Sequence, residues 1–265
     1  MKRHKVSSKL YICVIMLFLY LPIFIIIAYS FNDAKSTIWQ GFTFKWYKEL
    51  FKDSQIMTSV LNTVIVAVIS SISATMVGTL AAIGISNTKK RFRNVLINVS
   101  NMPIINPEIV TGISLMLLFT FFGGIFGFEL GMGTVIIAHI CFSVPYVILN
   151  VLPKLRQFNM SLYEAALDLG CPPQKAFFKV VLPDIMPGVL SGFLMAFAFS
   201  IDDFIITYFT RGSSFQTLPI EIYSMLRKRL SPKINALTTL IFLVVLSLLL
   251  IINLKDFKEL KGKKK

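Results

Sequence analysis

The chain has 265 residues, of which 55% are hydrophobic and 15% are charged, and its mean hydropathy is +0.73. Soluble domains carry about 25% charged residues, so this composition excludes an ordinary soluble protein and indicates a membrane protein. The net charge is +14, but the basic residues cluster beside apolar stretches and do not form the basic soluble face that nucleic-acid binding needs. The three cysteines, Cys13, Cys141 and Cys171, lack the spacing of metal or redox sites and are interpreted as free thiols.

Six apolar stretches are long enough to cross a bilayer as helices. A span needs about 20 residues, and in lipid every backbone amide must be satisfied internally. The predicted spans cover residues 10–31, 60–86, 95–122, 132–152, 185–210 and 234–254. Two of them are interrupted, at Asn106-Pro107 and at Asp202-Asp203. The predicted fold class is an all-α polytopic membrane protein, with residues 1–265 forming one transmembrane domain.

The distribution of lysine and arginine predicts the orientation of the spans. With both termini in the cytoplasm, the inner segments hold 18 basic residues and the outer segments hold 9, the bias expected of cytoplasmic loops. The first span is interpreted as an uncleaved anchor, because it exceeds the length of a signal-peptide core. The basic tail, 255–265, is expected to lie against anionic headgroups. An outer cluster runs against this rule: Arg227, Lys228 and Arg229.

A polar segment, 153–184, separates the fourth and fifth spans and faces the cytoplasm in this topology. Ser161 and Glu164 have the spacing of a capping box, which predicts that a helix starts there. Gly170 stands where a glycine with positive φ closes a helix. The prolines that follow suit the first turn of a second short helix, which is expected to end before Pro183. The residues alone leave two alternatives open, an amphipathic loop on the headgroups and a helix that docks on a partner.

The sequence "EAALDLG", followed by nine residues and "VVLP", resembles the EAA signature of ABC-importer permeases. Val180 stands where the signature has isoleucine, and this is the only departure. In that family the segment is a coupling helix that inserts into a cleft of the ATPase subunit. The resemblance implies the type I importer permease fold, with six transmembrane helices and a cytoplasmic coupling helix between helices 4 and 5. The ATPase-coupling residues that it implies are Glu164, Ala165, Ala166, Asp168, Gly170, Leu182 and Pro183.

Three acidic residues lie within predicted spans, where a charge costs about 2.5–3.5 kcal/mol and usually marks a function. They are Glu108, Asp202 and Asp203, and their spans contain no lysine or arginine to neutralise them. A cationic substrate would supply the missing counter-charge. These acids, with aromatic residues such as Tyr208 to flank ammonium groups or methylenes, are therefore candidates for a substrate pathway.

Structural alternatives remain open for the same residues. Asn106–Glu108 reads as N-cap, N1 and N2 of a helix that restarts inside the membrane, where an acid is favoured by the helix dipole. Asp202 lies about 26 Å along its span and would reach the outer interface. Aromatic residues such as Tyr208 ordinarily serve helix packing. His139, alone on an apolar span, is interpreted as a packed and hydrogen-bonded core residue.

The stretches "PEIVTGISL", "SIDDFIITYFTRG" and "LPIEIYSMLRKRLSPKINAL" are similar to the C-type permease subunit of spermidine/putrescine importers. This resemblance implies a linear polyamine as the substrate and a bacterial cytoplasmic membrane as the location. The partners that it implies are a second homologous permease subunit, two ATPase subunits and an extracytoplasmic polyamine-binding protein. That binding protein would meet Arg227, Lys228 and Arg229, for which a solvated basic face is the alternative.

The chain contains no Walker-type phosphate-binding loop, so ATP hydrolysis is assigned to a separate subunit. We therefore expect no catalytic residue, no metal and no cofactor in this chain, with ATP and Mg²⁺ held by the partner ATPase. Other readings are a permease for another small solute, such as an oxyanion, iron(III) or an opine-like compound, and a secondary carrier. The intramembrane acids argue against an anion, and the inverted repeats frequent in secondary carriers are not found. An intramembrane enzyme would need a catalytic motif, and none is recognised.

Overall fold

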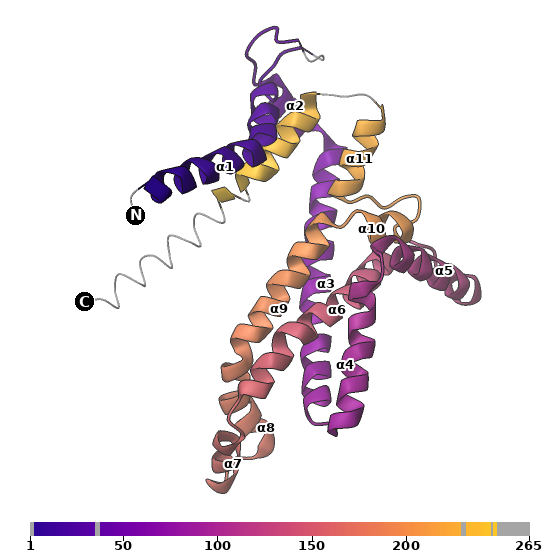
Figure 1. The fold of residues 1–265 in the computed structure, drawn as a ribbon. Coiled ribbons are helices and arrows are strands. Elements are labelled where there is room, and N and C mark those ends of the chain that lie inside the picture. Colours follow the sequence, from indigo (N-terminus) through magenta and orange to yellow (C-terminus); the bar gives the residue numbers. More distant parts are fainter. Residues whose placement is uncertain (1–2, 35–37, 229–231, 245, 248–265) are drawn as a thin grey trace. The chain divides into compact units, whose positions relative to one another are not determined.

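The structure is a computed structural model that describes residues 3–34, 38–228, 232–244 and 246–247 (Figure 1). The described residues are almost all helical, with an isolated antiparallel bridge between Asn32 and Phe42. They divide into two compact units, residues 1–57 with 221–265 and residues 58–220. Each unit is described by itself, and the prediction of one domain stays a prediction.

Five helices are long and apolar enough to cross a membrane. They are α1 (Arg3–Tyr29), α3 (Ser54–Ser86), α5 (Glu108–Phe126), α6 (Met132–Gln157) and a continuous helical run, 173–202, that ends in α9 (Leu182–Asp202). The predicted sixth span, 234–254, begins in an apolar helix at Pro232–Val244, and most of its remainder lies outside the described residues. The chain is thus an all-α, multi-pass membrane protein.

The third predicted span, 95–122, is two helices and not one. The first of them, α4 (Lys90–Ile105), ends before an extended break at Asn106 and Pro107, and α5 begins at Glu108. Pro107 therefore occupies the N-cap, so the predicted assignment of Asn106 to that position is wrong by one residue. Proline has no amide hydrogen and a fixed φ, which is why one helix stops and the next begins around it.

The fifth predicted span, 185–210, is also divided near its end. The α9 helix ends at Asp202, the backbone is extended at Asp203, and a short helix, α10 (Ile205–Thr210), follows after Phe204. Both interruptions read from the sequence are therefore real breaks in helical hydrogen bonding. They place non-helical backbone at the ends of two apolar helices.

Before α9 the helix does not end ahead of Pro183, contrary to prediction. The short α8 (Pro173–Ala176) passes into a π-helical turn at Phe177–Val181, and the Leu182 amide donates to the Phe177 carbonyl oxygen. Pro183 consequently falls in the first turn of α9, where a missing amide hydrogen costs little. The chain from 173 to 202 is thereby one uninterrupted helical rod.

Glycines bring α6 and α9 close together in the core of the second unit. A Cβ at Gly188 would lie 2.8 Å from the Asn150 carbonyl oxygen, and one at Gly192 would lie 3.1 Å from the Val147 Cα. A Cβ at Gly78 of α3 would lie 2.7 Å from the Val147 Cβ. Small residues four apart permit such close packing in membranes. The α3, α6 and α9 helices therefore form a tight centre for this unit.

In the first unit, a short amphipathic helix, α2 (Lys45–Lys52), is tied to its neighbours in this unit. The Trp46 indole nitrogen donates to the Asn32 carbonyl oxygen at 2.7 Å. Lys233 forms an ion pair with Glu49 at 3.6 Å. These contacts fix α2 next to the turn that follows α1 and next to the start of the last described helix.

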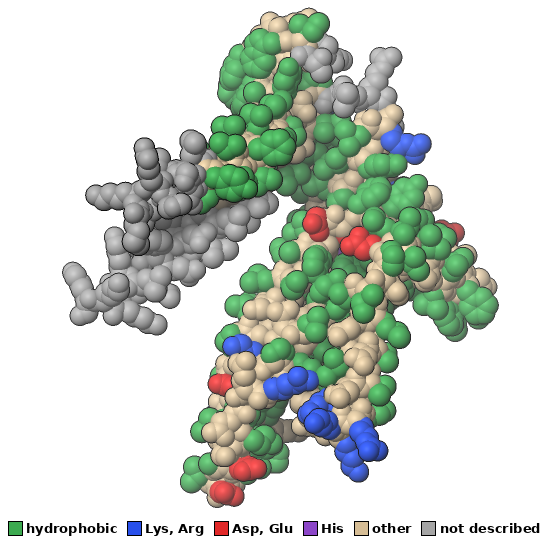
Figure 2. All heavy atoms as spheres, in the orientation of Figure 1, with side chains coloured by type: hydrophobic (Ala, Val, Ile, Leu, Met, Phe, Trp, Pro, Cys, Tyr) green, Lys and Arg blue, Asp and Glu red, His purple; other side chains and the backbone are tan. Residues whose placement is uncertain are grey.

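The second unit has two distinct ends (Figure 1). At one end α6 passes into α7 (Met160–Asp168) and α8, and at the other α5 and α10 lie beside each other. Figure 2 shows basic side chains gathered where α3 turns into α4 and acidic side chains over α7, while hydrophobic side chains cover much of the rest of this face. The two ends of this unit are separate candidate sites.

Candidate functional site

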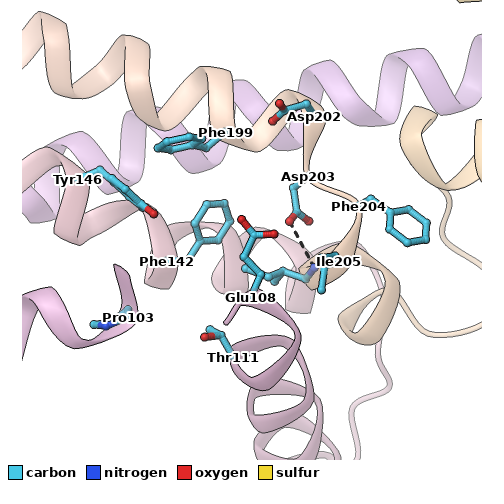
Figure 3. A pocket seen from close by; sticks show the side chains of 11 residues that line it. Pro103, Glu108, Thr111, Phe142, Tyr146, Phe199, Asp202, Asp203, Phe204 and Ile205 are labelled. Carbon is cyan, nitrogen blue, oxygen red and sulfur yellow. Dashed lines mark hydrogen bonds between the residues drawn. The ribbon is translucent and has the colours of Figure 1, made fainter. Parts of the chain in front are cut away.

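The two helix breaks meet at one pocket (Figure 3). Gly112 of α5 lets α10 approach, because a Cβ there would lie 3.0 Å from the Phe209 Cδ2. The pocket has a volume of about 420 Å³, and three acids and four aromatic rings are among its lining residues. At membrane depth, non-helical backbone is tolerated only where it is buried in protein or lines a cavity. Interrupted helices are also where transporters place their binding sites.

The predicted pathway acids Glu108, Asp202 and Asp203 all line this pocket, whereas Tyr208 is not among the lining residues. Glu108 is in the first turn of α5 and Asp202 is the last residue of α9, and both are exposed. The Asp203 side chain is only 6% exposed. Tyr208 packs against Phe204 with ring centroids 5.6 Å apart, so it lies one layer outside the pocket wall.

Asp203 is held by the start of α10. Its Oδ2 accepts from the Thr207 amide and the Thr207 hydroxyl, both at 2.7 Å, and its Oδ1 accepts from the Ile206 amide at 3.3 Å. His139 Nε2 lies 3.3 Å from Oδ2. The expectation that no partner base lies near these acids is therefore wrong for Asp203, because it covered lysine and arginine and not histidine.

His139 joins the pocket to three other helices. Its Nδ1 lies 2.6 Å from the Ser200 hydroxyl, its Nε2 lies 2.9 Å from the Thr207 hydroxyl, and Ser200 lies 3.0 Å from Ser70. The imidazole is 1% exposed, in agreement with its interpretation as a hydrogen-bonded core residue. Asp203, His139 and Ser200 follow the carboxylate–imidazole–hydroxyl order of a hydrolytic triad. However, Ser200 is 3% exposed, so a substrate cannot reach its hydroxyl.

The aromatic wall of the pocket was not predicted. Phe142 and Tyr146 of α6 face Phe199 of α9, and the Tyr146 and Phe199 ring centroids are 4.6 Å apart. Aromatic residues occur in every predicted span except 60–86, so their identity alone carried no signal. Spacing did carry one, since Phe142 and Tyr146 follow His139 by three and seven residues and so share its helix face.

The predicted coupling residues gather on α7 and at the start of α9. Glu164, Ala165 and Asp168 are exposed on α7 and Ala166 is half-buried, while Gly170 follows the helix and Leu182 and Pro183 open α9. The apolar stripe of α7 points outward, because Leu162 is 55% and Leu169 is 89% exposed. No described part of this chain covers that stripe, so it is available to another molecule.

Local backbone bonds fix both ends of α7. Asn159, and not Ser161 as predicted, is the N-cap, and its side chain accepts from the Ser161 amide at 3.1 Å. Asparagine is as good a cap as serine, and here it stands two residues earlier. Gly170 has a φ of +81°, as predicted, and the Cys171 amide donates to the Ala166 carbonyl oxygen at 3.1 Å, which is a Schellman motif.

The predicted basic cluster lies at the end of α11 (Leu218–Lys228). The Arg227 guanidinium is 5.9 Å from the centroid of the Tyr223 ring, and Arg229 lies outside the described residues. On the same helix the buried Glu221 accepts from the Gln55 amide group at 2.9 Å. The role of the cluster stays a prediction.

Metal-ligating residues do not cluster in the described part of the chain. No group of three or more His, Cys, Asp or Glu side chains there is arranged to hold a metal ion. Cys13, Cys141 and Cys171 are free thiols. The expectation of a chain without its own metal or cofactor remains a prediction.

Residues 74–255 match the model of a family described as the binding-protein-dependent transport system inner membrane component. The chain is 39% identical over 229 residues to the putrescine transport system permease protein PotI of Escherichia coli, covering 84% of this chain and 81% of that protein. It is 36% identical over 236 residues to the spermidine/putrescine transport system permease protein PotC of Escherichia coli, covering 89% and 87%. A bacterial ABC transporter involved in the import of the acidic polysaccharide alginate has a similar fold, with a TM-score of 0.72, 13% identity and 96% of both chains covered.

Proposed function

This chain belongs to the family of binding-protein-dependent transport system inner membrane components, and from that premise we propose that it forms half of the path along which an ATP-driven importer moves polyamines. As a permease it is a transport subunit and not an enzyme. The observation that carries the substrate class is the pocket at the two helix breaks, where Glu108 and Asp202 are exposed beside aromatic rings.

The chemistry of this pocket suits a linear cation. A polyamine carries ammonium groups separated by methylenes, and a charge-assisted hydrogen bond from ammonium to carboxylate is worth roughly 1.5–3 kcal/mol. The Tyr146 and Phe199 rings offer faces that attract ammonium and pack methylenes. An anionic substrate would meet like charges from Glu108 and Asp202 instead. The relatives named for putrescine and spermidine support the same substrate class.

The coupling segment is consistent with ATP hydrolysis by a separate subunit. We infer that the assembly has two ATPase subunits, one for each permease, and that the exposed face of α7, with Glu164, Ala165 and Asp168, docks on one of them. ATP and Mg²⁺ bind those ATPase subunits, and this chain binds neither. A second homologous permease completes the path, and an extracytoplasmic polyamine-binding protein delivers the substrate to the side that carries Arg227 and Lys228.

In this proposal both termini lie in the cytoplasm of a bacterium, and cysteine labelling tests the orientation. In a background without the three native cysteines, Ser213→Cys should react with a membrane-impermeant reagent added outside, and Gln174→Cys only after the inner face is opened. Both positions are exposed, so accessibility depends on sidedness alone. Labelling with the opposite sidedness contradicts the topology and with it the cytoplasmic coupling segment.

Uptake by the complete importer tests the substrate and the pocket. Glu108→Gln and Asp202→Asn keep the shape of each side chain and remove its charge, and each should slow spermidine uptake about 10–100-fold. Glu129→Gln is the matched control, because Glu129 is exposed but lies outside this pocket. Parental uptake in the double variant would remove the pocket from the pathway. If the parental complex imports no polyamine, the proposed substrate is wrong, and the remaining interpretation is a permease for another solute.

A further inference from the structure

We propose that Asp203 is a positioning residue, and that recognition of the transported cation in this pocket falls to Glu108 and Asp202. The inference rests on the proposed function, but it separates acids that the sequence alone treats as equivalent. Asp202 and Asp203 are neighbours in the chain and line the same pocket. Their surroundings differ, because Asp202 is exposed and the Asp203 side chain is 6% exposed.

The acceptor capacity of Asp203 is directed into the protein. Two bonds of 2.7 Å from Thr207 and the close approach of His139 reach Oδ2, and the Ile206 amide reaches Oδ1. A substrate ammonium that approached Oδ2 would have to displace a donor from Thr207 or His139, and Oδ1 already accepts from the Ile206 amide at the start of α10. Charge-assisted bonds to backbone amides are among the stronger ones in proteins, so this exchange is unfavourable.

One arrangement of protons that satisfies every bond of the network starts from the Thr207 hydroxyl. The Thr207 hydroxyl gives its proton to Asp203, so it accepts from His139 Nε2 and does not donate to it. A neutral imidazole with its proton on Nε2 accepts at Nδ1, and the donor there is the Ser200 hydroxyl. Ser200 in turn accepts from Ser70. Each donor of the network is thus used within the protein.

The network crosses the break that carries Asp202. Ser70 belongs to α3, His139 to α6, Ser200 to α9 and Thr207 to α10. Since α9 ends at Asp202, the bonds on either side of that residue fix the direction in which its carboxylate points. Buried networks of this kind hold one geometry when every member is satisfied. Asp203 and His139 thus act on the cation through Asp202.

A double-mutant cycle on the purified importer without substrate tests the positioning role. Asp203→Asn and His139→Gln should each lower the melting temperature by about 2–4 °C or more, and the double variant should lower it by less than their sum. His139→Gln keeps a donor near the Nε2 position, so it should be milder than His139→Leu. Asp202→Asn should leave the melting temperature within about 1 °C of the parent, because its charge faces the pocket.

Transport kinetics separate positioning from binding. Asp202→Asn should raise the KM for spermidine at least about tenfold, whereas Asp203→Asn should lower the maximal rate for spermidine and putrescine by the same factor and leave each KM within about twofold. A raised KM with an unchanged melting temperature in Asp203→Asn would make Asp203 a ligand and overturn the proposal. Additive melting temperatures would overturn it too.

Failure of the proposed function gives a different pattern. If the parent imports no polyamine and the melting temperatures still couple, the positioning network stands and the substrate class falls. Should His139→Leu not fold, Ser70→Ala replaces it, since it removes the far end of the same network. Ser70→Ala should lower the melting temperature less than His139→Gln does, and an equal or larger drop contradicts the chain of bonds described above.

Discussion

The coupling segment and the acidic pocket are built by opposite means. In α7 the motif residues are exposed, and the helix is shaped by bonds within its own sequence, from the Asn159 cap to the Gly170 turn. In the pocket the residues come from α4, α5, α6, α9 and α10, and Asp203 is fixed by contacts as distant in sequence as His139. A surface that another subunit grips needs local order, whereas a polar site among apolar helices needs partners from the whole unit.

This difference predicts which property a substitution will change: assembly, stability or transport. A change in α7 should weaken assembly and leave the stability of the chain intact, because few contacts of the core depend on it. A change in the buried network around Asp203 or in the helix packing below it should affect folding and transport together.

Gly170→Val should reduce uptake at least about tenfold. A φ of +81° costs a β-branched residue roughly 1–2 kcal/mol, so the turn would open and misdirect the exposed face of α7. Co-purification of the ATPase subunits should fall in parallel with uptake, at an unchanged level of the permease in the membrane. The matched control is Gly84→Val, since Gly84 has open space around it and an ordinary φ. Normal co-purification and uptake with Gly170→Val would remove α7 as the docking helix.

Gly188→Ala should destabilise the chain by about 1–3 kcal/mol, because its Cβ would lie 2.8 Å from the Asn150 carbonyl oxygen and α6 and α9 would have to separate. Thermal unfolding of the purified protein measures the loss, with Gly84→Ala as the control. In contrast to Gly170→Val, the fraction that remains folded should still bind the ATPase. An unchanged unfolding temperature would show that the two helices pack less tightly than described.

Asn159→Ala should cost about 1 kcal/mol of local helix stability, the usual cost of losing an N-cap. The effect should appear as faster amide exchange in the first turn of α7, with the rest of the chain unaltered. Ser161→Ala is the control and should change little, because Ser161 contributes its amide and not its side chain to this cap. If Ser161→Ala has the larger effect, the helix starts at the predicted capping box instead.

Phe199→Leu should reduce polyamine uptake by about 2–5-fold, from the loss of a cation–π contact of roughly 0.5–1 kcal/mol. Phe193→Leu is the control, since Phe193 stacks on Phe197 in the same helix and lies outside the pocket. Initial uptake rates at equal membrane levels measure the difference. Equal effects of the two substitutions would mean that the aromatic wall serves packing alone.

Much of the fold could be predicted because apolar length and glycine chemistry act locally. The all-α, multi-pass class, the closing turn at Gly170 and both helix breaks were predicted correctly, apart from shifts of a residue or two at Pro107 and Asn159. The passage of the helix through Pro183 was missed. The π-helical turn at Phe177–Val181 depends on how Phe177 and Val181 pack, and no pattern in the local sequence predicts such a turn.

The pocket could be predicted only in part, because it depends on contacts between residues that are far apart in the sequence. Charge in an apolar span was enough to single out Glu108, Asp202 and Asp203. Which of the two adjacent aspartates is exposed and which is buried could not be predicted, since helical periodicity ends at the break that follows Asp202. The partners of Asp203 lie 64 residues upstream, at His139, and four residues downstream, at Thr207, and only the folded chain brings them together.

The uninterrupted rod from 173 to 202 has a mechanical consequence. Its 30 residues extend over about 45 Å, from the segment next to α7 to the carboxylate of Asp202. On such a lever a tilt of about 5° at the gripped end displaces the far end by about 4 Å, more than the length of a hydrogen bond. If an ATPase subunit docks at α7 as proposed, small movements of that subunit would be enough to make or break contacts at Asp202.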